Sequence, residues 1–218
     1  MSDKSNKYGY VGVDIPAQSF GANKGVFNPA EINDLVADNK WTTFGQLELI
    51  ETQTASETYY DFTDLGNYNV HFLTFNNAGG STQAYFNIRL SNDNGSNFIA
   101  SGYQYAAQYG QANGTFGPLQ STSTTSFLGL TGYTLASETG SSAVGYVYLY
   151  NLLDSSKYSF CTYQTMTKIN SAQGNQPQFR FGSAVLPTAE THNAIRFFNN
   201  ATTSNDIDSI SLYGIRYS

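Results

Sequence analysis

The sequence predicts an all-β protein, an antiparallel β-sandwich (jelly-roll-like), preceded by a short N-terminal arm that contains one α-helix. Three observations predict this class. From residue 46 onward apolar residues recur with a period of two, clusters of Asn, Asp and Gly separate the apolar runs, and no helical pattern lies between them. Short strands joined by turns are typical of antiparallel sandwiches and jelly rolls. We expect eight or more strands.

The arm comprises residues 1–42 and carries the one convincing helical pattern of the chain. Asn28 is a suitable N-cap and Pro29 fits the first helical position. Glu31 stands three residues after Asn28, where its carboxylate can complete a capping box. These signals predict a helix over 29–40. Because about three turns of helix are too few to be stable alone in water, the helix needs a partner, either its own β domain or another chain.

The residues expected to make that contact are apolar or aromatic. Three of them recur at helical spacing and form a single stripe, and two flank the helix. Because buried apolar and aromatic side chains dominate protein interfaces, we expect these residues to anchor the arm on a partner. The predicted docking residues are Phe27, Ile32, Leu35, Val36 and Trp41.

The remaining residues, 43–218, are expected to form the β domain. The run 144–150 is apolar on both faces, as expected of a central strand that is covered on each side, and 207–217 closes the chain as a strand. The segment 92–95 favours a turn over a calcium loop, because an EF-hand needs flanking helices and a glutamate at its twelfth position. The run 82–90 alternates, with an apolar face formed by Ala84, Phe86, Ile88 and Leu90.

The composition disfavours several classes of partner. The chain has 218 residues, with 10 Lys and Arg against 16 Asp and Glu, and its net charge of −6 disfavours binding to nucleic acid. No apolar run is long enough to span a membrane as a helix, and no apolar core of a signal peptide follows the N-terminal lysines. The single cysteine, Cys161, lies in an alternating apolar run and is expected to be a buried, unreactive thiol.

Residues suited to catalysis are sparse. The two histidines, His71 and His192, are not at metal-ligand spacing, and we interpret them as a strand residue and a loop residue. The common hydrolase and nucleotide-binding motifs do not occur. A glycosidase needs two carboxylates about 5–10 Å apart, and the local acidic pairs are Glu48 with Glu51 and Asp61 with Asp64. We therefore predict no catalytic residue, no metal and no cofactor.

The segment 101–110 is rich in tyrosine and glutamine, and two interpretations are open. Tyrosine offers a large contact area and a hydrogen bond at small entropic cost, which suits sugar rings and protein interfaces. On this hypothesis the ligand-binding residues are Tyr103, Tyr105 and Tyr109. Alternatively, Tyr103 and Tyr105 pack on the sheet as neighbours on one face of a strand.

Segments at both ends and in the middle of the chain carry a family resemblance. They are Tyr8-Gly-Tyr-Val-Gly12, Gly25-Val-Phe27, Glu31-Ile32, Asp34-Leu35 and Trp41 in the arm, and 88–96, 150–153 and 210–216 in the β domain. Together they resemble virion structural proteins of marine tailed phages, especially cyanophages. The resemblance implies a non-enzymatic tail-fibre, baseplate-associated or capsid-decorating protein. It also implies a homo-oligomer, with a trimer favoured, that the arm docks on capsid or tail proteins.

Three functions therefore stay open at this point. The first is a virion structural protein, assembled in the host cytoplasm and released by lysis. The second is a receptor- or glycan-binding module that contacts a host surface glycan. The third is a small carbohydrate-active enzyme of sandwich fold, which the scarcity of acidic residues and histidines disfavours.

Overall fold

The computed structural model describes Ala30, Asn33, Asp34 and Ala37 of the arm and residues 47–138 and 140–215. The chain divides into two units, Met1–Gln46 with Ser218 and Leu47–Tyr217, and the described strands all belong to the second. The four described arm residues have helical backbone geometry but form no continuous segment, so the helix over 29–40 stays a prediction. The predicted docking residues Phe27, Ile32, Leu35, Val36 and Trp41 lie outside the described residues.

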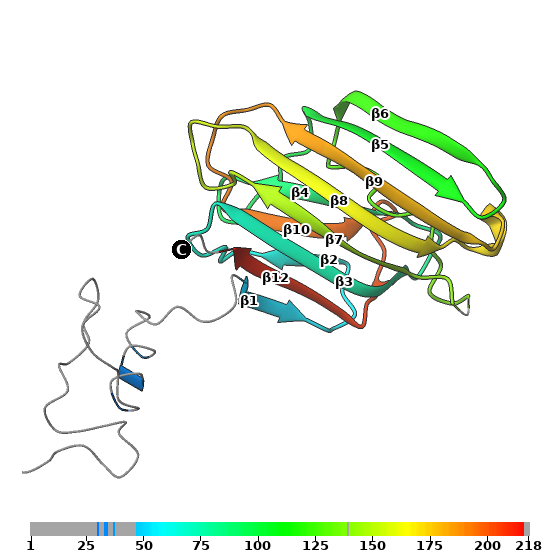
Figure 1. Ribbon diagram of the computed structural model, residues 1–218, viewed down its shortest axis with the longest axis horizontal. Coiled ribbons are helices and arrows are strands. Elements are labelled where there is room, and N and C mark those ends of the chain that lie inside the picture. The colour runs from blue at the N-terminus through cyan, green and yellow to red at the C-terminus, as the bar shows by residue number, and fades with distance from the viewer. Residues whose placement is uncertain (1–29, 31–32, 35–36, 38–46, 139, 216–218) are drawn as a thin grey trace, which may run out of the picture. The chain divides into compact units, whose positions relative to one another are not determined.

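The second unit is built from strands, as its alternating pattern predicts (Figure 1). One short 3₁₀ helix, Ser171–Gln173, interrupts them. The strands are β1 (Leu47–Gln53), β2 (Tyr59–Phe62), β3 (Val70–Gly80), β4 (Phe86–Ser91), β5 (Tyr103–Gln111), β6 (Phe116–Thr124), β7 (Ala143–Tyr150), β8 (Ser159–Lys168), β9 (Pro177–Leu186), β10 (Ala194–Asn199), β11 (Asn205–Asp206) and β12 (Ser209–Ile215).

These strands pair into two antiparallel sheets. The large sheet has nine strands in the order β1-β12-β3-β7-β8-β9-β5-β6, with β11 beside β3. The small sheet has three strands in the order β2-β10-β4. The predicted all-β, antiparallel class is therefore confirmed, and the two sheets differ greatly in width.

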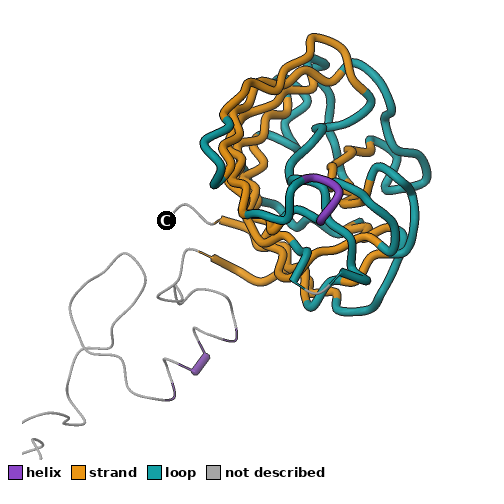
Figure 2. Tube along the Cα trace, turned by 90° about the vertical axis from the view of Figure 1, so that its right-hand side faces the viewer, coloured by secondary structure: helices purple, strands orange, loops and turns teal. Residues whose placement is uncertain are grey.

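Both sheets contribute to one core. The large sheet curves around this core, and the small sheet covers part of its inner face (Figure 2). Phe197 of β10 lies at the centre, with its ring centroid 5.0 Å from that of Phe75 in β3 and 4.9 Å from that of Phe86 in β4. The backbone N–H of Leu90 donates a hydrogen bond of 2.9 Å to the hydroxyl of Tyr103 in β5, which joins the two sheets at a second point.

A segment without regular structure covers another part of the inner face. Residues 125–135 run beside the small sheet, where Phe127 and Thr134 form isolated bridges to the chain at β4 and just before it. The hydroxyl of Thr165 in β8 donates to the carbonyl of Leu130 at 2.6 Å, which holds the segment against the large sheet. The segment is therefore fixed on two sides.

The predicted strand faces are confirmed at 82–90 and need a correction at 144–150. The four apolar residues predicted for the first run are fully buried. The second run forms β7 in the middle of the large sheet, but only one of its faces is covered. Val147 and Leu149 are buried, whereas Val144 is 41% exposed and Tyr148 is half-buried. The small sheet covers only the inner face, so the outer side of β7 stays apolar and open.

Replacing Phe197 by alanine tests this core. The free energy of unfolding should fall by about 3–5 kcal/mol, because the substitution removes a large buried ring and leaves a cavity. Urea unfolding of the full chain measures the change. Tyr158→Ala is the control, because Tyr158 is 47% exposed before β8, and it should cost less than about 1 kcal/mol. Equal losses in the two variants would contradict the assignment of Phe197 to the core.

Candidate functional site

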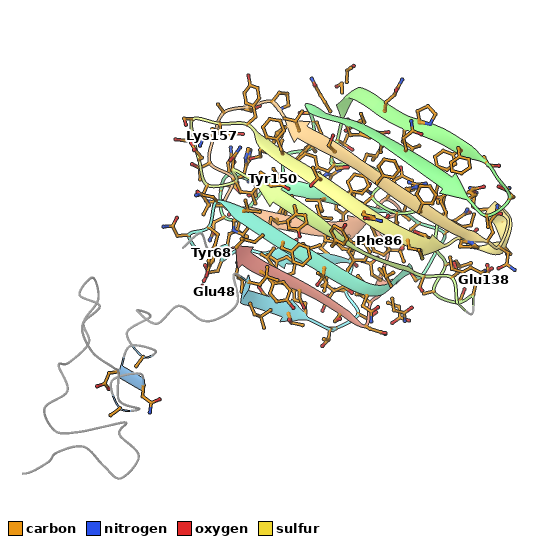
Figure 3. The ribbon with its side chains drawn as sticks, in the orientation of Figure 1. Glu48, Tyr68, Phe86, Glu138, Tyr150 and Lys157 are labelled. Carbon is orange, nitrogen blue, oxygen red and sulfur yellow. The ribbon has the colours of Figure 1, made fainter. Side chains whose placement is uncertain are left out.

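The face of the large sheet that points away from the small sheet is named here the outer face. It is turned toward the viewer in Figure 3, where Tyr150 is labelled. Cross-strand pairing places its residues in four rows across β7, β8, β9 and β5: Val144, Met166, Phe179 and Gly110; Tyr146, Gln164, Phe181 and Gln108; Tyr148, Thr162, Ser183 and Ala106; Tyr150, Phe160, Val185 and Gln104. The same face continues across the other strands with Leu47, Leu49, Tyr213, Phe72 and Phe116.

None of these outer-face residues has a charged side chain, although many are open to solvent. Lys168 lies on the same side at the end of β8, beyond these rows. Leu49 and Met166 are each 59% exposed, and Phe181 is 51% exposed. The small sheet differs, because its outward side carries Arg196 and Asp61, which form an ion pair with two hydrogen bonds of 2.7 and 2.6 Å. Contiguous exposed apolar surface on this scale marks interaction sites in soluble proteins.

Aromatic contacts organise the half of the outer face over β3 and β7. The ring centroid of Phe72 lies 4.7 Å from that of Tyr148 and 6.2 Å from that of Tyr213. The hydroxyl of Tyr146 donates to the side chain of Gln164 in β8 at 2.8 Å. These rings are held by one another and by the neighbouring strand, so a partner meets a surface that is already ordered.

The other half of the outer face has a second aromatic cluster and two shallow depressions. Phe179 lies between Phe116 and Phe181, with centroid distances of 6.1 Å to each. The depressions share Ala106 and Ser183, whose small side chains leave the surface hollow. One has a volume of about 320 Å³ and the other of about 390 Å³.

The three predicted ligand-binding tyrosines lie on the inner side of β5, where they alternate with the outer-face residues. Tyr103 is fully buried and packs edge-on against Phe127 at 4.9 Å, so the packing interpretation holds for this residue and a direct ligand contact does not. Tyr109 is half-buried and lies close to Gly117. Tyr105 is also half-buried, and it lines a pocket.

That pocket, named here the tyrosine pocket, has a volume of about 210 Å³. It opens between the segment 125–135 and the inner side of β5, β6 and β9. Only Tyr105 among its residues is a predicted site residue, because the others come from distant parts of the chain and share no motif. The lining residues are Tyr85, Tyr105, Leu119, Leu128, Gly129, Tyr133 and Arg180.

A serine, a histidine and a glutamate form a hydrogen-bonded chain elsewhere in the second unit. The hydroxyl of Ser159 lies 2.7 Å from Nδ1 of His192, and Nε2 of His192 lies 3.2 Å from a carboxylate oxygen of Glu190. Serine hydrolases use groups of these types. Here, however, Ser159 and His192 have no exposed surface, so a substrate has no access to the hydroxyl. These hydrogen bonds instead connect β8 to the segment before β10.

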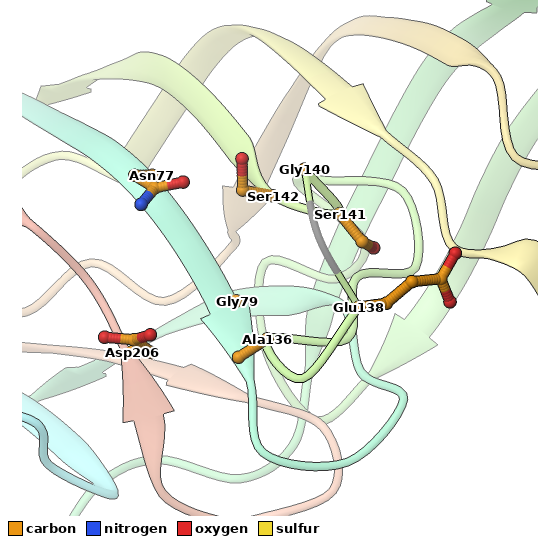
Figure 4. A pocket seen from close by; sticks show the side chains of 8 residues that line it. All are labelled: Asn77, Gly79, Ala136, Glu138, Gly140, Ser141, Ser142 and Asp206. Carbon is orange, nitrogen blue, oxygen red and sulfur yellow. The ribbon is translucent and has the colours of Figure 1, made fainter.

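A small polar pocket of about 110 Å³ lies between β3 and the segment 136–142 (Figure 4). It contains two acidic residues, Glu138 and Asp206, but the carboxyl group of Glu138 points away from Asp206. Ser171 donates to the Glu138 carboxylate at 3.0 Å. Within the described part of the chain, no group of three His, Cys, Asp or Glu side chains is arranged to hold a metal ion.

Cys161 and His71 are both fully buried. The predicted burial of Cys161 is confirmed, and burial raises the pKa of its thiol to about 12, which disfavours the reactive thiolate. Nε2 of His71 donates to the carbonyl of Leu65 at 2.8 Å, so Nδ1 is the unprotonated nitrogen, and it has no partner among the described residues. Protonating Nδ1 would bury an unpaired charge.

Comparison with known proteins finds no family model, no curated protein and no solved structure that matches this chain. Among the helical residues that the structure describes, none belongs to a helix long and apolar enough to cross a membrane.

Acidification should destabilise the second unit through its two histidines. Burial lowers the pKa of His71 and of His192 below the ordinary value of 6.5, and for His192 it outweighs the nearby Glu190 carboxylate. The unfolded chain therefore binds more protons than the folded one as the pH falls below about 6.5. The free energy of unfolding should be highest above that pH and should decrease as the pH falls further.

The variant His71→Gln checks this expectation, because it keeps a donor for the Leu65 carbonyl and removes one titrating group. Urea unfolding at about pH 7.5, 6.5 and 5.5 should show a shallower loss of stability in the variant, by at most about 1.4 kcal/mol per pH unit. An unchanged slope would show that His71 does not titrate in this range.

Proposed function

We propose that this chain is a non-enzymatic structural protein of a phage virion, either tail-fibre or baseplate-associated or capsid-decorating. In this proposal the second unit is a jelly-roll-like scaffold that packs against further copies of the chain through its outer face. The arm of residues 1–42, with its helix over 29–40, docks the assembly on capsid or tail proteins. The observation that carries the proposal is the uncharged, aromatic outer face, and the sequence resemblance supports the assignment to a virion.

The size of the outer face suits a stable contact between subunits. Strands about 4.8 Å apart and rows about 6.7 Å apart give it an area of roughly 700 Å². Stable protein interfaces bury about 800 Å² on each partner. Because the four rows of residues carry no charge, copies of the same face do not repel one another there, which suits a self-complementary interface. A homotrimer is the assembly that we favour.

A receptor- or glycan-binding module is the second candidate function. The tyrosine pocket favours it, because ring faces and hydroxyl groups of tyrosine suit recognition of sugars. The two functions are compatible, since the pocket lies on the inner side of the large sheet and the outer face stays free for subunit contacts. A purified chain that recognises a host surface glycan on an array would support this candidate.

A charge placed at the centre of the outer face should disrupt self-association. In Tyr148→Arg the new cation would be buried without a partner, so the affinity between copies should fall at least about tenfold. Light scattering coupled to size-exclusion chromatography of the full chain measures the mass over a range of concentrations. Ser96→Arg, at an exposed position in the loop that follows β4 of the small sheet, should leave the mass unchanged. A monomeric unmodified chain would contradict the subunit contact.

The virion assignment predicts that purified phage particles contain this chain. Quantitative mass spectrometry should find it in fixed proportion to the major capsid or tail proteins. Cross-linking should connect lysines of the arm, which lie at 4, 7, 24 and 40, to another virion protein. Hundreds of copies per particle would indicate capsid decoration, and a small multiple of three or six would indicate the tail. Absence of the chain from washed particles would overturn the assignment.

A further inference from the structure

We propose that the tyrosine pocket binds the ring of an acidic sugar and that Arg180 pairs with the carboxylate of this sugar. The inference deepens the second candidate function, glycan binding, by naming the chemical class of the glycan. It follows from three features of the pocket. They are the buried cation of Arg180, tyrosine hydroxyls that form no hydrogen bond with a described residue, and a backbone held in place at Gly129.

Arg180 is a buried cation that forms no ion pair with any residue in the described part of the chain. Its side chain lies on the inner, buried side of β9, and the residue is only 8% exposed. Its Nε donates to the side-chain oxygen of Gln178 and its Nη1 to the carbonyl of Gly129, both at 2.9 Å. Neither partner is charged. Burying a charge costs free energy unless an opposite charge compensates it, and such a charge can come from a ligand.

Among the described residues, no carboxylate forms an ion pair with Arg180. The titratable side chains that influence the pKa of Arg180 are all tyrosines, which are uncharged at neutral pH: Tyr105, Tyr109, Tyr133 and Tyr163. Among the described residues, no acceptor is bonded to Nη2 of Arg180. A guanidinium recognises a carboxylate through two parallel hydrogen bonds, and this unused edge provides donors for one.

The tyrosines of the pocket provide surfaces for a sugar ring. Tyr85 and Tyr133 meet edge to face with centroids 5.0 Å apart, and Tyr105 stands on the neighbouring wall. None of these three hydroxyls is bonded to a described residue, so each is free to exchange hydrogen bonds with sugar hydroxyls. A volume of about 210 Å³ is smaller than the roughly 300–1,000 Å³ of sites for drug-sized ligands. The pocket therefore fits one ring, such as the end of a chain.

The part of the pocket at Gly129 is held in place before any ligand arrives. Gly129 donates its N–H to the side chain of Asn87 at 2.8 Å while its carbonyl accepts from Arg180. Its φ of +66° suits glycine, and a Cβ atom at this position would lie 3.2 Å from Nη1 of Arg180. An ordered site loses little conformational freedom on binding, which favours recognition of a small ligand.

Binding of methyl glucuronide to the full chain tests the proposal, with methyl glucoside as the neutral sugar and acetate and sulfate as free anions. Ligand-observed NMR and calorimetry should give an affinity for the glucuronide at least about tenfold higher than for the glucoside or for either anion. Equal affinity for acetate would overturn the sugar part of the proposal, and equal affinity for the glucoside would overturn the role of the charge.

Variants of the full chain assign the binding to this pocket. Arg180→Gln should weaken glucuronide binding at least about tenfold, with folding checked by circular dichroism and thermal unfolding. Tyr133→Phe removes only a hydroxyl and should weaken binding severalfold even if the first variant does not fold. Lys168→Gln, which removes a cation outside the pocket, should bind as the unmodified chain does. Full binding by Tyr133→Phe and by a folded Arg180→Gln would overturn the proposal.

A glycan array separates failure of this inference from failure of the second candidate function. Binding to acidic glycans, lost in Arg180→Gln, supports both. Binding confined to neutral glycans would overturn the acidic-sugar proposal and leave glycan recognition standing. No binding to any glycan, together with no binding of the glucuronide, would overturn both.

Discussion

The packing of two sheets of unequal width around one core is the constraint on which the other features depend. Phe197 of the small sheet contacts both Phe75 and Phe86, so the inner residues of three strands must meet at one point. Side chains alternate between the two faces of a strand. The choice of residues that face the core therefore also decides which residues lie on the outer face. A slip of one residue in β8 would bury Met166 and expose Cys161. The aromatic outer face is thus a consequence of the strand register that the packing of the core requires.

The difference in width also separates two surfaces of different chemistry. The small sheet is too narrow to cover the whole inner side of the large sheet. Beyond it the segment 125–135 lies over Arg180 and contributes Tyr133 to the tyrosine pocket. The outer face lies on the opposite side of the same strands, and its four rows of residues carry no charge. One surface suits a broad contact with a protein, and the other suits a small ligand. The outer face and the tyrosine pocket can therefore each bind a partner at the same time.

The sequence predicted the fold class and the buried face of β4, because there apolar and polar residues alternate clearly. It misled at β7, where both faces are apolar and the pattern alone cannot tell a covered strand from one that presents an apolar surface. At Phe179, Arg180 and Phe181, hydrophobicity alone would turn the rings inward, yet the paired strands place Arg180 inside. Tyr85, Tyr105 and Tyr133 meet only through tertiary structure, so the pocket had no local signal.

The strand order places the entry of the chain and the tyrosine pocket at opposite margins of the large sheet. The chain enters the second unit at Leu47 in β1, one margin of the large sheet, and the last described residue, Ile215, pairs with that same strand. The tyrosine pocket lies against β5, β6 and β9, at the opposite margin. The point at which the chain enters the second unit and the tyrosine pocket are therefore separated by nearly the whole width of the large sheet.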